Sequence, residues 1–488
     1  MNFYDNLNAK NVFHFFEEIS KIPRGSFNEK GISDYLVNFA KERNLECYQD
    51  DIYNVIIKKN ATEGLGDAPT IILQGHTDMV CEKNSGTEHD FLTDPIEIIQ
   101  KDDMLYANGT TLGADNGIAV AMMLAILDSS DIAHPRIECL FTTQEEVGLN
   151  GAQALEPSSL DGKILINLDS EEYGNFLVSC AGGATAEVSL DCEWTLLDGD
   201  YDVFNLKISG LKGGHSGLNI IEERGNAIKI MGRLLSELDK VVNFEIQSIE
   251  AGSKDNAIPR EAMATIAVAK GKEDALSEFV SAWESTLRNE LRGKDNPISI
   301  VFEKTDTNKV TVFNQNTKRN VIYFLSTVSN GVNTMSYDIK DLVESSKNIG
   351  VISQDANYTK CLFSIRSSVE SLLLSQINEL EQVAGVLNSK VKVSGMYPGW
   401  EYSPVSPIRD LLVEVYKEIE KKEPAVSAIH AGLECGILKQ KLGELDIVSL
   451  GPDIFNPHSP DEHVSVSSID KAYALLVAVL EKANKLPK

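Results

Sequence analysis

Residues 70–80, "TIILQGHTDMV", place a nearly continuous apolar run directly before two polar residues, His76 and Asp78. A strand with one face in water alternates apolar and polar residues, whereas a continuous apolar run is typical of a strand buried on both faces. Such strands occur in parallel sheets that helices cover on both sides. Similar segments follow along the chain: "DIYNVIIKK" (51–59), "RIECLFTTQ" (136–144) and "KILINLD" (163–169).

Helical patterns alternate with these strands. Apolar residues recur at helical spacing in "NVFHFFEEISKI" (11–22) and "NEKGISDYLVNFAKERN" (28–44). The segment "DNGIAVAMMLAILDSS" (115–130) is apolar on all sides and predicts a buried helix that opens with Asp115. Buried strands separated by helices predict a three-layer α/β domain.

The pattern changes after about Phe176, where alternating strands such as "YDVFNLKISG" (201–210) precede amphipathic helices. The segment that begins at Ser253 is echoed by one that begins at Ser346, and each precedes a helix, which indicates a weak internal duplication. Chance similarity of two strand-then-helix units is the alternative. From about Met396 the α/β pattern returns. We therefore predict a discontinuous catalytic domain (residues 1–185 and 395–488) interrupted by an inserted α+β lid domain (186–394) of two ferredoxin-like halves.

The composition restricts the function. The 488 residues carry a formal charge of −28, from 45 basic and 73 acidic residues, which argues against nucleic acid or an anionic membrane as a partner. No run approaches the roughly 18 apolar residues of a membrane span, and the first residues lack the pattern of a signal peptide. Seven dispersed cysteines without a CxxC pair suit reduced thiols. We expect a cytoplasmic protein.

Carboxylates and imidazoles follow several of the predicted strands. Each alone has an ordinary explanation, as a surface histidine, a helix N-cap or a turn residue. Together they would converge at the carboxyl ends of the strands, where open sheets bind ligands. Because so many negative groups repel unless cations compensate them, they predict a metal site, and its size suits two metals. The residues are His76, Asp78, Asp115, Glu145, Glu146, Asp169 and His458.

The ligand types suggest particular roles. Imidazole and carboxylate ligands suit Zn²⁺, with Mn²⁺ or Co²⁺ as alternatives. A two-metal site needs a bridging carboxylate, for which Asp115 in its glycine-rich loop is suited. Asp78 shares a strand face with His76 and could orient its ring. In "QEEV" the adjacent Glu145 and Glu146 end an apolar strand, so strand alternation should point them to opposite sides and separate their roles.

Five ordered motifs carry a resemblance to a known family: "GHTDMV", "GADNG", "QEEVGLNGA", "NLD" and "HSPDE". The chain resembles the co-catalytic di-zinc metallopeptidases that include carnosinase-type dipeptidases and aminoacylases, and the resemblance spans essentially the whole chain. "GGHSG", "NAIPREA" and "HAGLECG" fit the branch of bacterial aminoacyl-histidine (Xaa-His) dipeptidases. The implied fold is a zinc-peptidase-like catalytic domain with a lid.

The resemblance also implies site roles. The first of two divalent metals, most often Zn²⁺, would be held by His76 and Asp169 and the second by Glu146 and His458. Asp115 would bridge them, with a cis peptide bond to Asn116. Glu145 would be the general base, and Asp78 would orient His76. In the lid, His215 would polarise the scissile carbonyl. Asn256, Arg366 and Gly432 would bind substrate.

Some assignments keep alternatives. His215 could be an ordinary loop histidine, Arg366 a surface arginine, and His430 either a ligand-facing or a packing residue. Small family members dimerise through an insert of about half this size and borrow the histidine from the partner. The duplicated insert suggests that two halves mimic that dimer within one chain, so that His215 acts in cis. A homodimer stays open.

The implied activity is hydrolysis of Xaa-His and similar unhindered dipeptides, by a water that bridges the metals and gives its proton to Glu145. Within the family, the alternative is an N-acyl amino-acid deacylase or desuccinylase. From another class, the alternative is a non-catalytic protein that binds metal or peptide.

Overall fold

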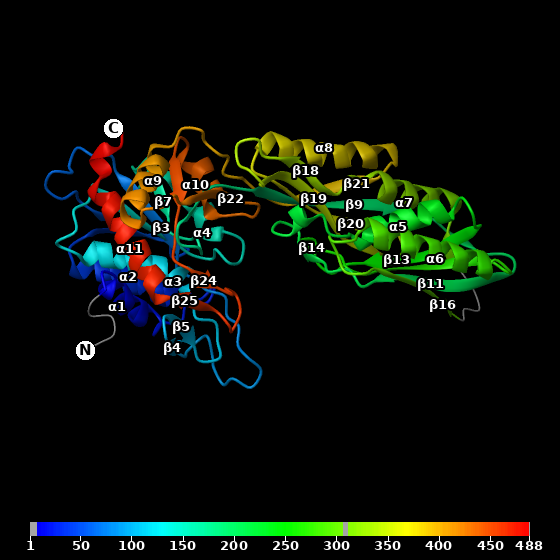
Figure 1. Cartoon of the computed structure of the whole chain (residues 1–488), viewed down its shortest axis with the longest axis horizontal. Coiled ribbons are helices and arrows are strands. Elements are labelled where there is room, and N and C mark those ends of the chain that lie inside the picture. Colours follow the sequence, from blue (N-terminus) through cyan, green and yellow to red (C-terminus); the bar gives the residue numbers. More distant parts are fainter. Residues whose placement is uncertain (1–6, 306–310, 488) are drawn as a thin grey trace. The chain divides into compact units, whose positions relative to one another are not determined.

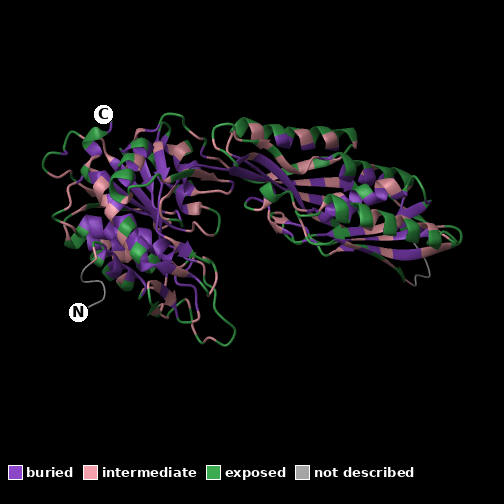
Figure 2. Ribbon diagram, in the orientation of Figure 1, coloured by how far each residue is buried: buried purple, intermediate pink, exposed green. Residues whose placement is uncertain are grey.

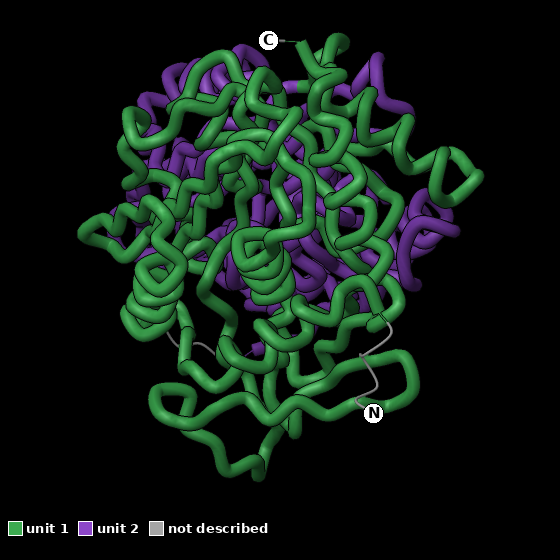
Figure 3. The backbone as a smooth tube through the Cα atoms, turned by 90° about the vertical axis from the view of Figure 1, so that its left-hand side faces the viewer, with its two compact units in different colours: residues 1–179, 402–428, 433–488 green, residues 180–401, 429–432 purple. Residues whose placement is uncertain are grey.

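The computed structural model describes residues 7–305 and 311–487. These residues divide into two compact units (Figure 3). Unit 1 comprises the described residues up to Ser179, Tyr402–Ala428 and those from Leu433 onward, and unit 2 comprises Cys180–Glu401 and Ile429–Gly432. The expected insert, 186–394, lies inside unit 2. Unit 2 also includes residues 180–185, 395–401 and 429–432. Ala181 N donates to Ile429 O (3.2 Å) and Ala431 O (3.0 Å), which ties the segment 429–432 to the residue before β9.

The main sheet of unit 1 contains eight strands in the described part of the chain, in the order β1-β2-β6-β3-β7-β23-β8-β22. Figure 1 labels three of them, β3, β7 and β22. Strand β3 runs parallel to β6 and β7, and β7 runs parallel to β23. Every residue of β3 and β6 is buried, so both faces of the central strands are covered, as the apolar runs predict. The bounds are β1 Glu46–Gln49, β2 Val55–Lys59, β3 Ile71–His76, β6 Ile137–Thr142, β7 Ile164–Asn167, β8 Asn175–Cys180, β22 Ala425–Ile429 and β23 Asp446–Ser449.

Helix α3 is the central helix of unit 1. It packs against α1 and β3, and nearly all of its residues are buried, as its uniformly apolar sequence predicts. In the longer helices of unit 1 one face carries the buried apolar residues. Figure 2 shows buried residues on these helices and along the strands of the main sheet. The helices are α1 Lys10–Ile19, α2 Lys30–Glu42, α3 Ala114–Asp128, α4 Asn150–Ala154, α9 Pro407–Glu420, α10 Glu434–Leu442 and α11 Val466–Glu481. A small sheet, β24-β25-β5-β4, joins β4 Ile98–Lys101, β5 Met104–Ala107, β24 Ile454–Phe455 and β25 His463–Ser465.

Unit 2 is built on one long antiparallel sheet. Among the described residues its order is β16-β11-β15-β13-β19-β20-β9-β21, with β18 paired to β19. The strands are β9 Gly182–Asp191, β11 Tyr201–Ser209, β13 Phe244–Ala251, β15 Ala262–Ala269, β16 Ser299–Thr305, β18 Gly331–Met335, β19 Val343–Gln354, β20 Tyr358–Ser367 and β21 Lys390–Tyr397. The helices are α5 Ala227–Leu238, α6 Glu273–Glu290, α7 Gln315–Thr327 and α8 Glu370–Val386. The short pairs are β10 Trp194–Leu196 with β17 Thr311–Phe313, and β12 Gly214–His215 with β14 Ala257–Ile258.

The sheet of unit 2 consists of two halves with the same topology. The first half runs β11–α5–β13–β15–α6–β16, and the second uses β9, α7, β19, β20, α8 and β21. In each half the first and third strands are central, which is the ferredoxin-like arrangement. The halves meet where Ala251 of β13 pairs with Ile352 of β19. The predicted duplication is therefore present, but the first half is inserted after β9 of the second.

All seven cysteines fall within the described residues, and no disulfide bond joins any two of them there. None of the helices in the described ranges combines the length and apolar character needed to span a membrane.

Candidate functional site

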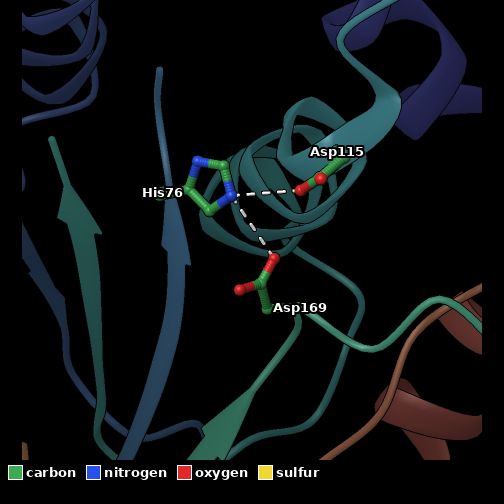
Figure 4. Close-up of side chains that lie close together, drawn as sticks. All are labelled: His76, Asp115 and Asp169. Carbon is green, nitrogen blue, oxygen red and sulfur yellow. Dashed lines mark hydrogen bonds and ion pairs between the residues drawn. The ribbon is translucent and has the colours of Figure 1, made fainter. Parts of the chain in front are cut away.

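Two side chains at strand ends of unit 1 and one at the start of a helix form a first donor group (Figure 4). His76 closes β3, Asp169 follows β7, and Asp115 lies at the start of α3. His76 Nε2 lies 3.1 Å from Asp115 Oδ1 and 3.4 Å from Asp169 Oδ1. One nitrogen and two carboxylate oxygens within 4.8 Å of one another could hold a metal ion.

A second donor group shares Asp115 with the first. His458 Nε2, from the loop between β24 and β25, lies 3.1 Å from Asp115 Oδ2 and 3.1 Å from Glu146 Oε2. The two carboxylate oxygens of Asp115 therefore face different histidines. This is the arrangement that a bridging carboxylate requires in a two-metal site.

Asp78 is buried beside both donor groups. Its Oδ1 lies 3.4 Å from His76 Nδ1, so it can orient the ring as predicted. It also accepts backbone hydrogen bonds from Glu145 N (3.0 Å) and Glu146 N (3.3 Å), and Ser26 Oγ donates to it at 2.8 Å. One carboxylate thus fixes the imidazole and the glutamate pair.

The loop that carries Asp115 has an unusual backbone. The peptide bond between Asp115 and Asn116 is cis, as the resemblance implies, and Gly113 adopts φ 69°. Asn116 Oδ1 accepts from His76 N (3.1 Å), and its Nδ2 donates to Leu168 O (3.0 Å), which ties this loop to the ends of β3 and β7. Asp115 is not the N-cap of α3, because Gly113 occupies that position without a side-chain cap. The ordinary N-cap explanation for Asp115 is therefore excluded.

The glutamate pair occupies a turn. Strand β6 ends at Thr142, and Gln144 has φ 52°, so strand alternation does not separate the two side chains, and that part of the prediction is wrong. In this turn both backbone N–H groups donate to the Asp78 carboxylate, and the two glutamate side chains have different partners. Glu146 reaches His458, whereas Glu145 joins His76 and Glu146 in a third potential ligand group.

The electrostatics of the cluster favour bound cations. Burial, together with Asp115 and Glu146, raises the pKa of Asp169 to about 6, although His76 opposes the shift. Burial and neighbouring carboxylates raise the pKa of Glu145 well above its usual value. Hydrogen bonds to Asp115 and Glu146 raise the pKa of His458 to about 11. The buried carboxylates repel one another and need compensating positive charge, which two divalent cations would supply.

An unsatisfied polar atom points the same way. Among the described residues, Glu146 Oε1 is buried and has no hydrogen-bond partner. A buried carboxylate oxygen without a partner is costly unless a cation binds it. The donor set therefore fits a pair of divalent ions, with nitrogen and oxygen ligands of the kind that Zn²⁺, Mn²⁺ and Co²⁺ accept.

In unit 2, the backbone fixes the tautomer of His215. Its Nδ1 accepts hydrogen bonds from Gly217 N (3.2 Å) and Leu218 N (3.1 Å), so the neutral ring carries its proton on Nε2. Burial and the nearby Arg366 lower the pKa of His215, which favours the neutral ring. These bonds suit a satisfied loop histidine as well, and they leave Nε2–H as a donor, so the role of His215 stays a prediction.

Arg366 lies in β20 beside His215 and is 8% exposed, so it is not a surface arginine. Its Nη1 donates to Tyr397 Oη at 3.1 Å, and among the described residues its buried Nε has no hydrogen-bond partner. A Cβ at Gly432 would lie 2.7 Å from the Tyr397 ring, so glycine is needed there to make room for that ring. Sequence reasoning missed Tyr397, which ends a strand with no distinctive pattern.

The remaining residues of this cluster are placed as follows. Asn256 precedes β14, and its backbone O accepts from Ser216 N at 2.8 Å, next to His215. Its side chain is exposed. His430 is buried, and its Nε2 lies 2.7 Å from Ser346 Oγ, which favours the packing role for this histidine. Unit 2 therefore brings together His215, Arg366, Asn256 and Gly432, whose substrate-binding roles stay predictions.

Comparisons with known proteins agree with this geometry. A model of peptidase family M20/M25/M40 matches residues 72–482. The cytosol non-specific dipeptidase of Escherichia coli (strain K12) is 37% identical over 479 residues, which are 98% of this chain and 98% of that one. A crystal structure of aminoacylhistidine dipeptidase from Vibrio alginolyticus has a TM-score of 0.93 and 37% identity, and covers 99% of this chain and 98% of that chain. The aminopeptidase PepT from Bacillus cereus ATCC 10987 shares the fold, with a TM-score of 0.55 and 18% identity over 98% of this chain and 99% of that chain.

Two donor groups around a shared carboxylate, at the carboxyl ends of parallel strands, define a metal-dependent hydrolase with a dinuclear site. The chain belongs to peptidase family M20/M25/M40.

Proposed function

We propose that this protein is a metal-dependent dipeptidase that hydrolyses Xaa-His and similar unhindered dipeptides. The observation that carries the proposal is the position of Asp115, whose two oxygens each face a different histidine at 3.1 Å. Support for dipeptides as substrates comes from the E. coli and V. alginolyticus relatives, both of which are dipeptidases by name and match nearly the whole chain.

We propose the following roles for the metal-centre residues. His76 and Asp169 would hold one ion, Glu146 and His458 the other, and Asp115 both. When bound, two divalent cations, most often Zn²⁺ in such sites, would polarise the scissile carbonyl and lower the pKa of the attacking water towards about 7.

The chain's own groups would move the protons. Glu145 would accept a proton from the attacking water and then return it to the amine that leaves, acting first as base and then as acid. His215, with its proton on Nε2, would donate a hydrogen bond to the carbonyl oxygen as negative charge develops there. The buried Nε of Arg366 and its Nη1, oriented by Tyr397, would bind the substrate carboxylate.

The first prediction concerns substrate and metal. Protein stripped with a chelator should lose turnover, and Zn²⁺, Mn²⁺ or Co²⁺ should restore it. The assay would compare dipeptides with histidine and other residues in the second position. N-acetyl and N-succinyl amino acids serve as the contrast set. Preferential cleavage of the N-acyl compounds would instead support a deacylase, and no metal-dependent hydrolysis at all would support a non-catalytic binding protein.

The second prediction concerns His215. A His215→Ala variant should lose about 10²–10³-fold in kcat, the usual loss for one donor to a developing oxyanion. The surface variant His14→Ala serves as a control and should keep full activity. Because both halves of the lid sheet lie in one chain, we propose that His215 acts in cis. His215→Ala and Glu145→Ala chains, carrying different tags and refolded together, should form no active hybrid; recovered turnover would show that the histidine comes from another chain.

Oligomeric state and cellular location need separate measurements. A homodimer could form without shared active-site residues, and light scattering of the purified chain would measure it. We also propose a cytoplasmic location, which the E. coli relative, a cytosol dipeptidase by name, supports. Cell fractionation with the native protein tests the location.

A further inference from the structure

Two buried charged residues lie on either side of the loop that carries Asp115. Arg24 and Glu462 are each 2% exposed, and neither belongs to the candidate ligand groups. Within residues 7–305 and 311–487, neither forms an ion pair with an opposite charge. Both instead bind peptide groups of this loop and of its neighbours.

Glu462 binds the N–H side of the loop. Its Oε2 accepts from Leu112 N (2.7 Å) and Gly113 N (2.9 Å), and its Oε1 accepts from Asp115 N (3.2 Å). Glu462 lies in the same β24–β25 loop as His458. It therefore links the bridging aspartate to the loop of the second donor group.

Arg24 binds the carbonyl side of the loop. It donates to Gly113 O (2.5 Å) and, across the loop, to Thr77 O (3.0 Å) and Asp78 O (3.4 Å). Thr77 directly follows His76, so Arg24 links the bridging aspartate to the strand end of the first donor group. Glycine is required here because a Cβ at Gly113 or at Gly117 would lie 2.5 Å from the guanidinium.

We infer that Arg24 and Glu462 are positioning residues that aim the two oxygens of Asp115 at separate metal ions. Arg24 holds the bridging carboxylate in position relative to the His76 and Asp169 group. Glu462 holds it in position relative to the Glu146 and His458 group. Each residue therefore controls the affinity of one ion more than the other. The inference rests on the proposed two-metal function.

The use of full charges supports this role. Three backbone N–H groups or three carbonyls could be satisfied by neutral side chains or by secondary structure. A buried charge without an ion-pair partner is expensive, so a purely structural contact would favour a neutral group. Opposite charges on the two sides of one loop hold its peptide groups more firmly, because hydrogen bonds to charged groups are about twice as strong as neutral ones.

The experiment measures metal affinity in the full-length chain. Glu462→Gln keeps the side-chain shape but turns one acceptor into a donor, and Arg24→Lys keeps the charge but cannot span three carbonyls. Each should weaken one of the two metal-binding steps by about 10–100-fold, measured by titration calorimetry with Zn²⁺ and Mn²⁺. Matched controls are Glu138→Gln, another buried carboxylate that accepts from Asp161 N and Gly162 N, and Arg409→Lys, which donates to Ser403 O and Pro404 O.

Single-site backgrounds assign each effect to one ion. In a His458→Ala chain, which retains the first donor group, Arg24→Lys should weaken the remaining ion and Glu462→Gln should not. In an Asp169→Asn chain, Glu462→Gln should weaken the remaining ion and Arg24→Lys should not. If both substitutions weaken either ion equally, or no more than the controls do, the inference is wrong.

Two readouts separate positioning from folding and from function. In the fully loaded protein, the electron paramagnetic resonance signal of coupled Mn²⁺ ions should change in both variants and not in the controls. Thermal melting of the metal-free chains identifies a variant that fails to fold. If Glu462→Gln fails to fold, Glu462→Asp replaces it, and the same loss of metal affinity is expected. If the unsubstituted chain binds no divalent metal, the proposed function fails; if it binds two but the variants match the controls, only this inference fails.

Discussion

With Glu145 replaced by glutamine, kcat for a dipeptide is expected to fall by about 10²–10⁴-fold, the usual contribution of a general acid–base group. Two metal ions should remain bound per chain, because Glu146 and not Glu145 pairs with His458 at 3.1 Å. Glutamine matches the shape of Glu145 but cannot accept a proton from the attacking water. Elemental analysis of gel-filtered protein, together with steady-state kinetics, measures both quantities.

The neighbouring substitution is the control for this prediction. Glu146→Gln should reduce the metal content, since it removes a charged oxygen from the second donor group. Glu145 also lies within 4.8 Å of His76 and Glu146, so geometry alone permits it as a ligand. Loss of metal from Glu145→Gln with both ions retained in Glu146→Gln would exchange the two roles.

The central sheet could be predicted because its physical signal is local. Continuous apolar segments require burial on both faces, and β3, β6 and β7 are buried at every position. The uniformly apolar segment that became α3 was predicted on the same ground. Burial of each element is encoded within that element, so no knowledge of distant contacts was needed.

The lid has features that local sequence patterns do not encode. The strand-then-helix echo at Ser253 and Ser346 predicted two halves, and two ferredoxin-like halves are present. The nesting of one half within the other was not predicted, because β9 pairs with β20 and β21, far along the chain. Strand pairing between distant segments leaves no trace in the periodicity of either strand. The segment 429–432 joined unit 2 through backbone hydrogen bonds, which are equally invisible in sequence.

That the candidate metal ligands lie together could be predicted because their chemistry is conspicuous: several carboxylates and imidazoles that converge need a compensating cation. Residues that act by hydrogen-bonding peptide groups have no comparable pattern in the sequence. Arg24 follows an ordinary proline, and Glu462 lies inside a recognised motif without a role that sequence could assign. Tyr397 was missed because it ends a strand with no distinctive pattern, and the glycines that make room for its ring, Gly183 and Gly432, lie far from it in the sequence.

The turn after β6 changes how the adjacent glutamates are explained. Strand alternation would have separated Glu145 and Glu146 by a property of any strand. The structure instead relies on Asp78, which accepts both backbone N–H groups. The two glutamates thus depend on a single buried carboxylate. The same residue positions the His76 ring, whose Nδ1 lies 3.1 Å from the Asp78 backbone O and 3.4 Å from its Oδ1.

Replacement of Asp115 by alanine is expected to have the largest effect on metal binding. Its two oxygens lie 3.1 Å from His76 Nε2 and from His458 Nε2, so both donor groups lose a ligand at once. Both metal affinities should fall, and kcat/KM should drop to background, since water that no cation activates has a pKa far above the value of about 7 that a bound metal ion gives it. Titration calorimetry with Zn²⁺ and a dipeptide assay provide the measurements.

A matched control separates this effect from the loss of a structural aspartate. Asp446 is half-buried in unit 1 and accepts from Ser406 Oγ and Ile408 N at the other end of the parallel strands, so Asp446→Ala should keep both ions. Asp169→Asn and His458→Ala should each weaken one ion and spare the other, because each belongs to one donor group only. If Asp115→Ala also spared one ion, the two groups would not share this carboxylate, and the bridging role would have to pass to another residue.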